Sequence, residues 1–208
     1  MSESALLTLR GIVKRFGGVT ALAGVDFQLR AGEIHALLGE NGAGKSTLIK
    51  ILGGILHPDA GEIHIGGRAA EIREVSDADR LGIRLIHQEL SLAPNLSVAE
   101  NIFLGREPAR WGFVKRRRMN ADAETLIRDL ALPEIGSVGT LVADLSVAQQ
   151  QMVEIARALS AQARVLVLDE PTASLSETET EALFGKLRAL AGLLSAPTGT
   201  IVAGEFSR

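Results

Sequence analysis

The sequence predicts an α/β fold whose core sheet is assembled from both ends of the chain. Short apolar runs that are typical of strands occur before residue 90 and again at residues 165–168. The runs at 33–38 and 165–168 are each followed by a turn and a helical segment, the alternation that favours a parallel sheet. Residues 93–163 are mostly helical in pattern with no convincing strand, which predicts a helical insertion.

Composition narrows the class of protein. The chain has 208 residues, of which 46% are hydrophobic and 23% charged, as in an ordinary soluble globular protein. A net charge of −3 argues against nucleic-acid binding by overall charge. The absence of cysteine excludes disulfides and thiolate chemistry, and fits a reducing compartment. We find no signal peptide and no apolar run that could span a bilayer, so a membrane role requires another chain to supply the spanning part.

The strands of the first third are predicted from polarity and turn residues. Alternating runs predict half-buried strands, and the apolar run at 33–38 predicts a buried strand that ends at Gly39. A helix is expected from Lys45 to Leu52, where Gly53 and Gly54 follow. The alternating strands are expected at 6–9, 25–29 and 62–65, and a further strand at 83–86.

The remaining elements are predicted mainly from helix caps. Ser97 and Ser146 each begin a Ser-x-x-Glu/Gln capping box, which marks the start of a helix. Asn120 is expected to cap a helix over 121–131. Residues 165–168 predict a buried strand, 178–190 a helix and 200–203 a last strand.

Residues 39–46 form a phosphate-binding pattern. Glycines let the backbone approach a phosphate chain closely, and the N-terminus of the following helix adds partial positive charge. Lys45 is predicted to reach the β- and γ-phosphates, and Ser46 to ligate Mg²⁺. A chance glycine-rich turn would not explain the strand and helix that flank the loop. The expected nucleotide contacts are Gly39, Glu40, Asn41, Gly42, Ala43, Gly44, Lys45, Ser46 and Thr47.

This loop alone is compatible with kinases, GTPases and many ATPases. Asp169 and Glu170 follow the strand at 165–168, at the end of a sheet where ligands of α/β proteins gather. Asp169 is expected to hold the Mg²⁺ shell, and Glu170 to orient the water that attacks the γ-phosphate. The alternative is that both are acidic residues that end a strand before the Pro171 turn.

Two motifs carry a family resemblance. Leu-Asp-Glu-Pro-Thr at 168–172 resembles the Walker B segment of ABC-type ATPases, and residues 145–159 resemble the signature helix found in no other P-loop class. The resemblance covers about residues 5–190. It implies a P-loop NTPase fold with a parallel core sheet, an antiparallel β subdomain and a helical insertion. It also implies a single ATP-binding domain over 1–208, incomplete at its C-terminal end, with the helical subdomain at about 93–163.

The resemblance assigns further roles. Ser146 would contact the γ-phosphate of ATP on a second ATP-binding domain, as a homodimer or tandem half, although Ser146 also serves as a plain helix cap. Gln88 would meet Mg²⁺ or the attacking water, and Phe16 would stack on adenine unless it is a buried core residue. Ser176 replaces the aspartate usual in the segment that follows Thr172.

The signature helix also suggests a branch of the family. Val147 and Ala148 replace two glycines, which is similar to the first half of carbohydrate importers of the ribose, xylose and galactose type. Such a protein would energise monosaccharide import through a separate transmembrane permease served by a periplasmic sugar-binding protein. It would be cytoplasmic and peripheral on the inner face of the membrane. The basic run at 115–118 is interpreted as a solvated surface, with permease or lipid headgroup contact as the alternative.

The resemblance fails at one point. The family keeps a γ-phosphate histidine just after the strand that follows Walker B, whereas the four histidines here are His35, His57, His64 and His87. A truncated first half, or a diverged end with impaired hydrolysis, would explain this, and ATP binding with weak turnover is then expected. The competing functions are a catalytically impaired remnant and a soluble ABC ATPase outside transport.

Overall fold

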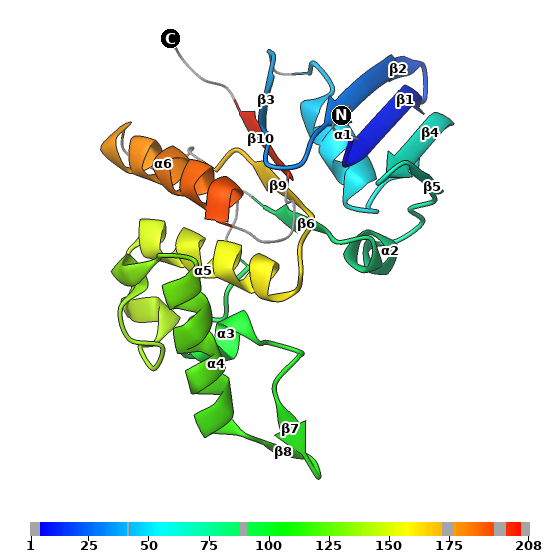
Figure 1. Cartoon of the computed structure of the whole chain (residues 1–208). Coiled ribbons are helices and arrows are strands. Elements are labelled where there is room, and N and C mark those ends of the chain that lie inside the picture. The colour runs from blue at the N-terminus through cyan, green and yellow to red at the C-terminus, as the bar shows by residue number, and fades with distance from the viewer. Residues whose placement is uncertain (1–4, 41, 88–90, 172–176, 194–198, 205–208) are drawn as a thin grey trace. The chain divides into compact units, whose positions relative to one another are not determined.

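The computed structural model describes residues 5–40, 42–87, 91–171, 177–193 and 199–204 (Figure 1). The chain divides into two compact units. Unit 1 comprises Met1–Gln88, Ala163–Ala173 and Phe184–Arg208, and unit 2 comprises Glu89–Gln162 and Ser174–Leu183. Within the described residues, none of the helices is long and apolar enough to cross a membrane.

Unit 1 contains an antiparallel sheet with the strand order β2-β1-β4-β5. The strands expected at 6–9, 25–29 and 62–65 are confirmed, and the first two are longer than predicted. β1 continues past Gly11, which has a φ of 57° and lies at a register shift against β2. The strands are β1 (Leu7–Phe16), β2 (Val19–Leu29), β4 (Ala60–Ile65) and β5 (Arg68–Ala70).

A second sheet of unit 1 is parallel and has the order β3-β10-β9-β6. Its strands are β3 (Ile34–Leu38), β6 (Ile83–Ile86), β9 (Val165–Asp169) and β10 (Gly199–Gly204). β9 is buried as expected, but the prediction of a buried β3 is wrong. Leu38 is 65% exposed, because β3 pairs only with β10 among the described strands and lies at the edge of this sheet.

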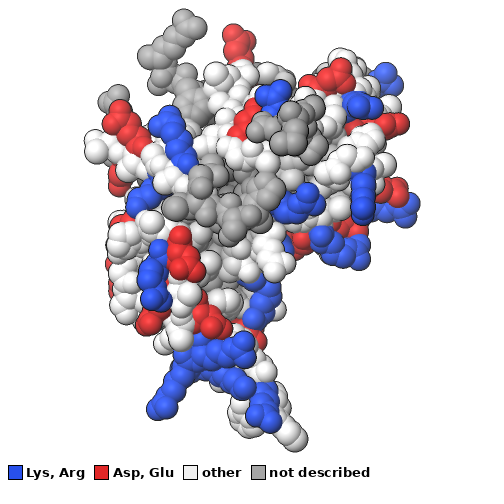
Figure 2. All heavy atoms as spheres, in the orientation of Figure 1, with Lys and Arg blue, Asp and Glu red and all other residues white. Residues whose placement is uncertain are grey.

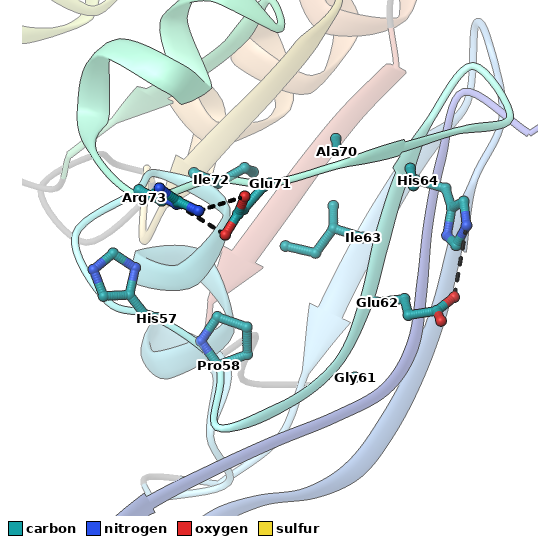
Figure 3. A pocket seen from close by; sticks show the side chains of 11 residues that line it. His57, Pro58, Gly61, Glu62, Ile63, His64, Ala70, Glu71, Ile72 and Arg73 are labelled. Carbon is teal, nitrogen blue, oxygen red and sulfur yellow. Dashed lines mark hydrogen bonds and ion pairs between the residues drawn. The ribbon is translucent and has the colours of Figure 1, made fainter.

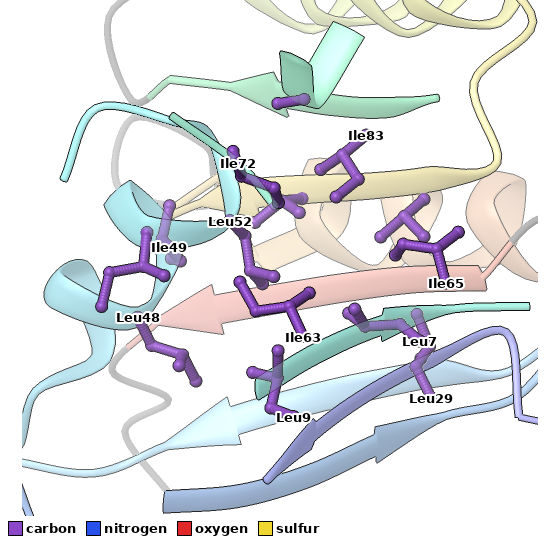
Figure 4. Close-up of a cluster of buried hydrophobic side chains, with 14 of the residues drawn as sticks. Leu7, Leu9, Leu29, Leu48, Ile49, Leu52, Ile63, Ile65, Ile72 and Ile83 are labelled. Atoms are coloured by element: carbon purple, nitrogen blue, oxygen red, sulfur yellow. The ribbon is translucent and has the colours of Figure 1, made fainter. Parts of the chain in front are cut away.

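The core of unit 1 packs α1 (Lys45–Leu52) against both sheets. The antiparallel sheet contributes Leu7 and Leu29, α1 contributes Ile49 and Leu52, and the parallel sheet contributes Ile83 (Figure 4). All five are essentially inaccessible to solvent. Burying a side chain of this size contributes about 1.5–3 kcal/mol to the stability of the folded state. The second half of α1 is therefore held by packing against both sheets.

Unit 2 is largely helical. α3 (Val98–Ile102) and α5 (Val147–Ser160) both start with the predicted capping boxes, of Ser97 with Glu100 and of Ser146 with Gln149. Two short 3₁₀ helices, η1 and η2, precede α5. α6 (Glu177–Leu193), expected at 178–190, is shared between the two units. The 3₁₀ segments are Pro133–Ile135 and Val142–Asp144.

Unit 2 also departs from the sequence prediction. The strands β7 (Ala109–Arg110) and β8 (Phe113–Val114) form a hairpin where no strand was expected. α4 (Arg116–Asp129) begins five residues before the predicted start, so Asn120 lies inside the helix and Lys115 is its N-cap. The end of the hairpin leads directly into the helix, and an early start lets Met119 pack in the interior, where it is 1% exposed. A short helix, α2 (Val75–Arg80), was not predicted.

Candidate nucleotide-binding site

The phosphate loop runs from the end of β3 to the start of α1 (Figure 1). Gly44 is the N-cap of α1 with a φ of 88°, and Gly42 has a φ of 85°. Gly44 also lies so close to β2 that an added Cβ would come within 2.6 Å of the Ala21 oxygen and 2.7 Å of Leu22 Cδ2. The bend that presents the helix N-terminus thus requires glycine both for its dihedral angle and for space.

The loop holds its lysine close to the backbone. Lys45 Nζ donates hydrogen bonds to the carbonyl oxygens of Gly39 and Glu40, the latter over 3.1 Å. The Ala43 N–H donates to the same Glu40 oxygen over 3.1 Å, which closes a tight turn. Ser46 is exposed in the first turn of α1 and Thr47 is half-buried. The predicted contact Asn41 lies outside the described residues.

The carboxylate pair lies at the same edge of the parallel sheet as this loop. β10 pairs Ala203 with Leu37 of β3 on one side and with Asp169 of β9 on the other. Two strand spacings of about 4.8 Å therefore separate the backbones at Leu37 and Asp169, roughly 10 Å. Asp169 is half-buried at the end of β9, directly before Glu170. The strand order thus brings Leu37 and Asp169, 132 positions apart in the sequence, to the same end of the sheet.

Glu170 has an unusual backbone conformation. Its φ is 47°, in the left-handed region that few non-glycine residues occupy. The residue is half-buried and precedes Pro171, so the chain turns sharply as it leaves β9. Backbone strain of this kind tends to occur at functional sites. The alternative of an ordinary strand end would not require a strained glutamate at this turn.

The predicted site residue Gln88 lies outside the described residues. The strand that leads toward it is described: β6 pairs Ile86 with Leu168 of β9 in parallel register. His87, the next residue, is thus one step past this pair, as Asp169 is on β9. Residues 172–176, which include Ser176, also lie outside the described part of the chain.

Phe16 is a surface residue rather than a core residue. Its side chain is 46% exposed at the end of β1, opposite Val19 of β2. The ammonium of Lys14 lies 5.7 Å from the centroid of its ring. β2 also supplies Ala21, which lies against Gly44. The alternative of a buried core Phe16 is therefore wrong, and the ring is available for stacking.

Ser146 lies in unit 2, at the N-terminus of α5. Its Oγ accepts a hydrogen bond from the Gln149 N–H over 3.3 Å, while its own N–H donates to Gln149 Oε1 over 2.8 Å. Gln149 also donates to the Glu134 carbonyl over 2.7 Å, which ties the cap to η1. Ser146 remains exposed, and the neighbouring Val147 is 42% exposed. The cap therefore presents a hydroxyl at a fixed helix N-terminus.

The structure adds a contact that the sequence analysis missed. Glu154 of α5 is only 5% exposed, and its Oε1 accepts hydrogen bonds from the Ser91 N–H over 2.6 Å and from Ser91 Oγ over 2.9 Å. Arg157 Nη1 donates to the Ser91 carbonyl over 3.2 Å. Glu154 and Arg157 of α5 thus hold Ser91, three residues after Gln88, in place. The sequence signal for this contact is the position of Glu154 between the apolar residues Val153 and Ile155 of α5.

A separate hollow of about 820 Å³ lies on unit 1 (Figure 3). Arg73 and Glu71 pair within it at 2.8 Å, and His64 Nε2 lies 3.7 Å from Glu62. None of the predicted site residues lines this hollow. Among the residues described, no group of three or more His, Asp or Glu side chains could hold a metal. The hollow is therefore separate from the candidate nucleotide site.

Comparison with known proteins agrees with this geometry. The family model for the ABC transporter matches residues 22–173. The chain is 57% identical over 185 residues to a ribose import ATP-binding protein of Rubrobacter xylanophilus, and 54% identical over 189 residues to one of Streptomyces coelicolor. These matches cover 89% and 91% of this chain but 37% and 36% of the relatives. The chain thus spans little more than a third of their length.

Solved structures show the same fold. The ADP conformation of an ATP-binding cassette of an ABC transporter superposes with a TM-score of 0.83 at 25% identity, covering 98% of this chain and 82% of that one. A nucleotide-free cassette gives a TM-score of 0.78 at 25% identity, covering 97% and 81%. The predicted P-loop NTPase architecture is confirmed. Fold, motifs and relatives agree that the chain belongs to the ABC transporter family, as an ATP-binding cassette.

Proposed function

We propose that this chain binds ATP with Mg²⁺ and couples its hydrolysis to the import of a monosaccharide through a separate membrane permease. The observation that carries the proposal is the shared strand β10, whose register brings the phosphate loop and Asp169 to one sheet edge. The sugar class is supported by relatives named as ribose import proteins, of which this chain spans a part.

The loop supplies the phosphate-binding groups. The positive φ angles of Gly42 and Gly44 shape the turn before α1. The free N–H groups and the dipole of a helix N-terminus favour an anion there. Lys45 already lies beside this backbone through Gly39 and Glu40. When ATP binds, phosphate oxygens would replace these two carbonyl oxygens as the acceptors of the Lys45 ammonium. The ammonium would stay in place and gain a negatively charged partner.

The residues present fit a magnesium ion. Ser46 is exposed in the first turn of α1, the helix that follows β3. Asp169 ends β9, which lies two strands from β3 in the parallel sheet. A hydroxyl and a carboxylate are the oxygen ligands that Mg²⁺ takes, with Gln88 as a third candidate. Bound Mg²⁺ would neutralise charge on the β- and γ-phosphates. Asp169 and Ser46 are therefore assigned to its shell.

Glu170 is assigned as the general base. Its carboxylate directly follows the metal-binding Asp169, and its strained backbone fixes the turn from which the side chain projects. A carboxylate can accept a proton from a water held against the γ-phosphate. Gln88 is proposed to help position that water. Phe16, exposed on the hairpin beside the loop, is proposed to stack on the adenine ring.

Ser146 is proposed to act on a second ATP-binding domain, as a homodimer or tandem half. Its Oγ accepts the capping hydrogen bond and leaves the hydroxyl proton for a phosphate oxygen. With a permease and a periplasmic sugar-binding protein, the chain would work as a single cytoplasmic domain at the inner membrane face.

ATP affinity and steady-state turnover test the proposal on the full chain. Lys45→Ala is expected to weaken ATP binding at least tenfold, because one charged phosphate contact is worth about 1.5–3 kcal/mol. Glu170→Gln is expected to keep the affinity and remove the turnover. Turnover that does not depend on Glu170, or unchanged affinity in Lys45→Ala, would refute the assigned roles. Co-purification with ribosomes or DNA instead of a permease would refute the transport function.

A further inference from the structure

The β7–β8 hairpin of unit 2 ends in an aromatic turn. The strands pair Arg110 with Phe113, and the Lys115 N–H donates to the Pro108 carbonyl over 2.7 Å. The two turn residues, Trp111 and Gly112, have φ angles of 58° and 81°. Two successive positive φ angles are typical of a type I′ hairpin turn. Such turns favour Asn, Asp or Gly at the position that tryptophan occupies here.

Folding does not explain the choice of Trp111. A left-handed conformation is unfavourable for a bulky side chain, and this indole is 85% exposed, so packing within the chain does not compensate. Phe113 is 80% exposed and Val114 46%. Trp111 and Phe113 are the two most exposed large hydrophobic side chains of the described residues. Their exposure indicates a contact outside the chain.

Basic residues surround these aromatics. Residues 109–118 are all exposed and include Arg110, Lys115, Arg116, Arg117 and Arg118, with no acidic residue among them. Arg116 lies 3.5 Å from Glu100, and Arg118 lies 3.5 Å from Asp122.

The other three basic side chains of this segment, Arg110, Lys115 and Arg117, form no ion pair with the acidic residues that the structure describes. Figure 2 shows this concentration of positive charge over β7, β8 and the start of α4. The segment therefore contrasts with the whole chain, whose net charge is −3.

We propose that residues 109–118, the aromatic–basic hairpin, bind directly to the surface of an anionic phospholipid bilayer. Trp111 and Phe113 would enter the headgroup region, where aromatic side chains are favoured. The basic side chains would pair with lipid phosphates. This contact goes beyond the proposed ATPase function and does not depend on nucleotide.

The shape and charge of the hairpin favour lipid over protein occupants. Its strands are two residues long, so it offers a narrow projection rather than the roughly 800 Å² per partner of a stable protein interface. A symmetric contact with a second copy would set five basic residues against the same five. An anionic bilayer supplies negative charge and an apolar layer together.

Trp111 is the only tryptophan in a chain that lacks tyrosine, so its fluorescence reports on this site alone. Vesicles of phosphatidylcholine with about one third phosphatidylglycerol are expected to shift its emission to the blue and to make it quenchable by spin-labelled lipid. Pure phosphatidylcholine vesicles should have little effect. About 1 M salt should weaken binding strongly, because the Debye length falls to about 3 Å.

Variants assign the effect to the hairpin. Each basic residue near an anionic surface contributes about fivefold in affinity. The triple variant Arg110→Gln, Lys115→Gln, Arg117→Gln should therefore bind anionic vesicles at least tenfold more weakly. Trp111→Gly, followed by vesicle flotation, should also weaken binding, while its stability is kept because glycine accepts the positive φ.

The matched control neutralises three exposed basic residues of unit 1, Arg10, Arg30 and Arg68. This Arg→Gln triple variant changes the net charge equally and should bind vesicles with less than a threefold loss. Equal losses in the two triple variants would overturn the proposal. So would the absence of a fluorescence shift with anionic vesicles at low salt, or a shift that depends on protein concentration without lipid. ATP affinity is measured in parallel, so a failed ATPase role is distinguished from failed lipid binding.

Discussion

Gly44→Ala tests the geometry of the phosphate loop most directly. Two costs add at this position. A left-handed conformation costs an alanine about 1–2 kcal/mol, and the new Cβ would lie 2.6 Å from a backbone oxygen of Ala21. Moving that strand or the helix start resembles overpacking a core, which costs about 1–3 kcal/mol. Replacing glycine by alanine also reduces the entropy of the unfolded chain, which stabilises the protein by about 0.4–1 kcal/mol. We therefore expect Gly44→Ala to lower the free energy of unfolding by about 2–4 kcal/mol.

Gly42→Ala is the matched control. Its φ of 85° nearly equals that of Gly44, but apart from its own chain neighbours no heavy atom of the described residues lies within 4 Å of the added Cβ. Only the dihedral cost applies, so a loss of about 1 kcal/mol or less is expected. The difference between the two variants isolates the close approach of α1 to β2. Gly44→Ala should also weaken ATP binding, because the N-terminus of α1 must move.

Urea unfolding of both variants without nucleotide measures the two stabilities, and titration with ATP measures the affinities. The clash predicts that Gly44→Ala is less stable than Gly42→Ala by about 1–3 kcal/mol. Equal stabilities would refute the close approach to β2. A destabilised Gly44→Ala with unchanged ATP affinity would refute the claim that this helix start forms the phosphate site.

Three further predictions concern carboxylates. Glu170→Gly should remove turnover yet raise stability by up to ~1 kcal/mol, since glycine relieves the φ of 47°; a urea midpoint below that of Glu170→Gln would contradict the strain. The Ser97 N–H, and to a lesser degree the Ser97 hydroxyl, donate hydrogen bonds that lower the pKa of Glu100. The ionised Glu100 therefore stabilises the folded state above its unfolded pKa of about 4.3. This stabilisation is lost as the pH falls through the lowered folded pKa. Glu100→Gln should thus cost about 1 kcal/mol of stability at pH 7 and progressively less as the pH falls through the lowered folded pKa of Glu100. An equal loss in thermal unfolding at every pH would be the contrary result. Glu154→Ala should cost about 1–3 kcal/mol of stability by leaving the Ser91 N–H unpaired. A double-mutant cycle with Ser91→Ala, which removes only the hydroxyl, should show coupling, and additive losses would argue against the hydroxyl hydrogen bond.

The elements predicted correctly are those whose signal is local. The capping boxes of Ser97 and Ser146 carry both hydrogen-bonding partners within four residues, and the structure contains both. The phosphate loop is likewise complete within eight residues, and α1 starts and ends as predicted. The proposed chemistry of the site could therefore be predicted from the sequence, because each motif is contiguous.

The errors arise where strand pairing or packing, rather than the local residue pattern, determines the structure. β3 is apolar enough for a buried strand, but its place at the sheet edge exposes Leu38. Asn120 is a good cap by type, yet the hairpin before α4 and the burial of Met119 move the helix start to Arg116. Glu154 accepts hydrogen bonds from Ser91, which lies 63 residues away in sequence. None of these partners can be identified from residue patterns alone.

β10 shows how far the site depends on such distant partners. This strand contributes no predicted site residue, but it pairs with β3 and β9 along both of its edges. Its register alone therefore determines that Leu37, two residues before the phosphate loop, and Asp169 lie at the same level. A slip of one residue against either neighbour would shift the two sides by about 3.3 Å and invert the faces of the slipped strand. The two motifs could be predicted separately from the sequence, but their meeting at one site depends on a strand that carries neither.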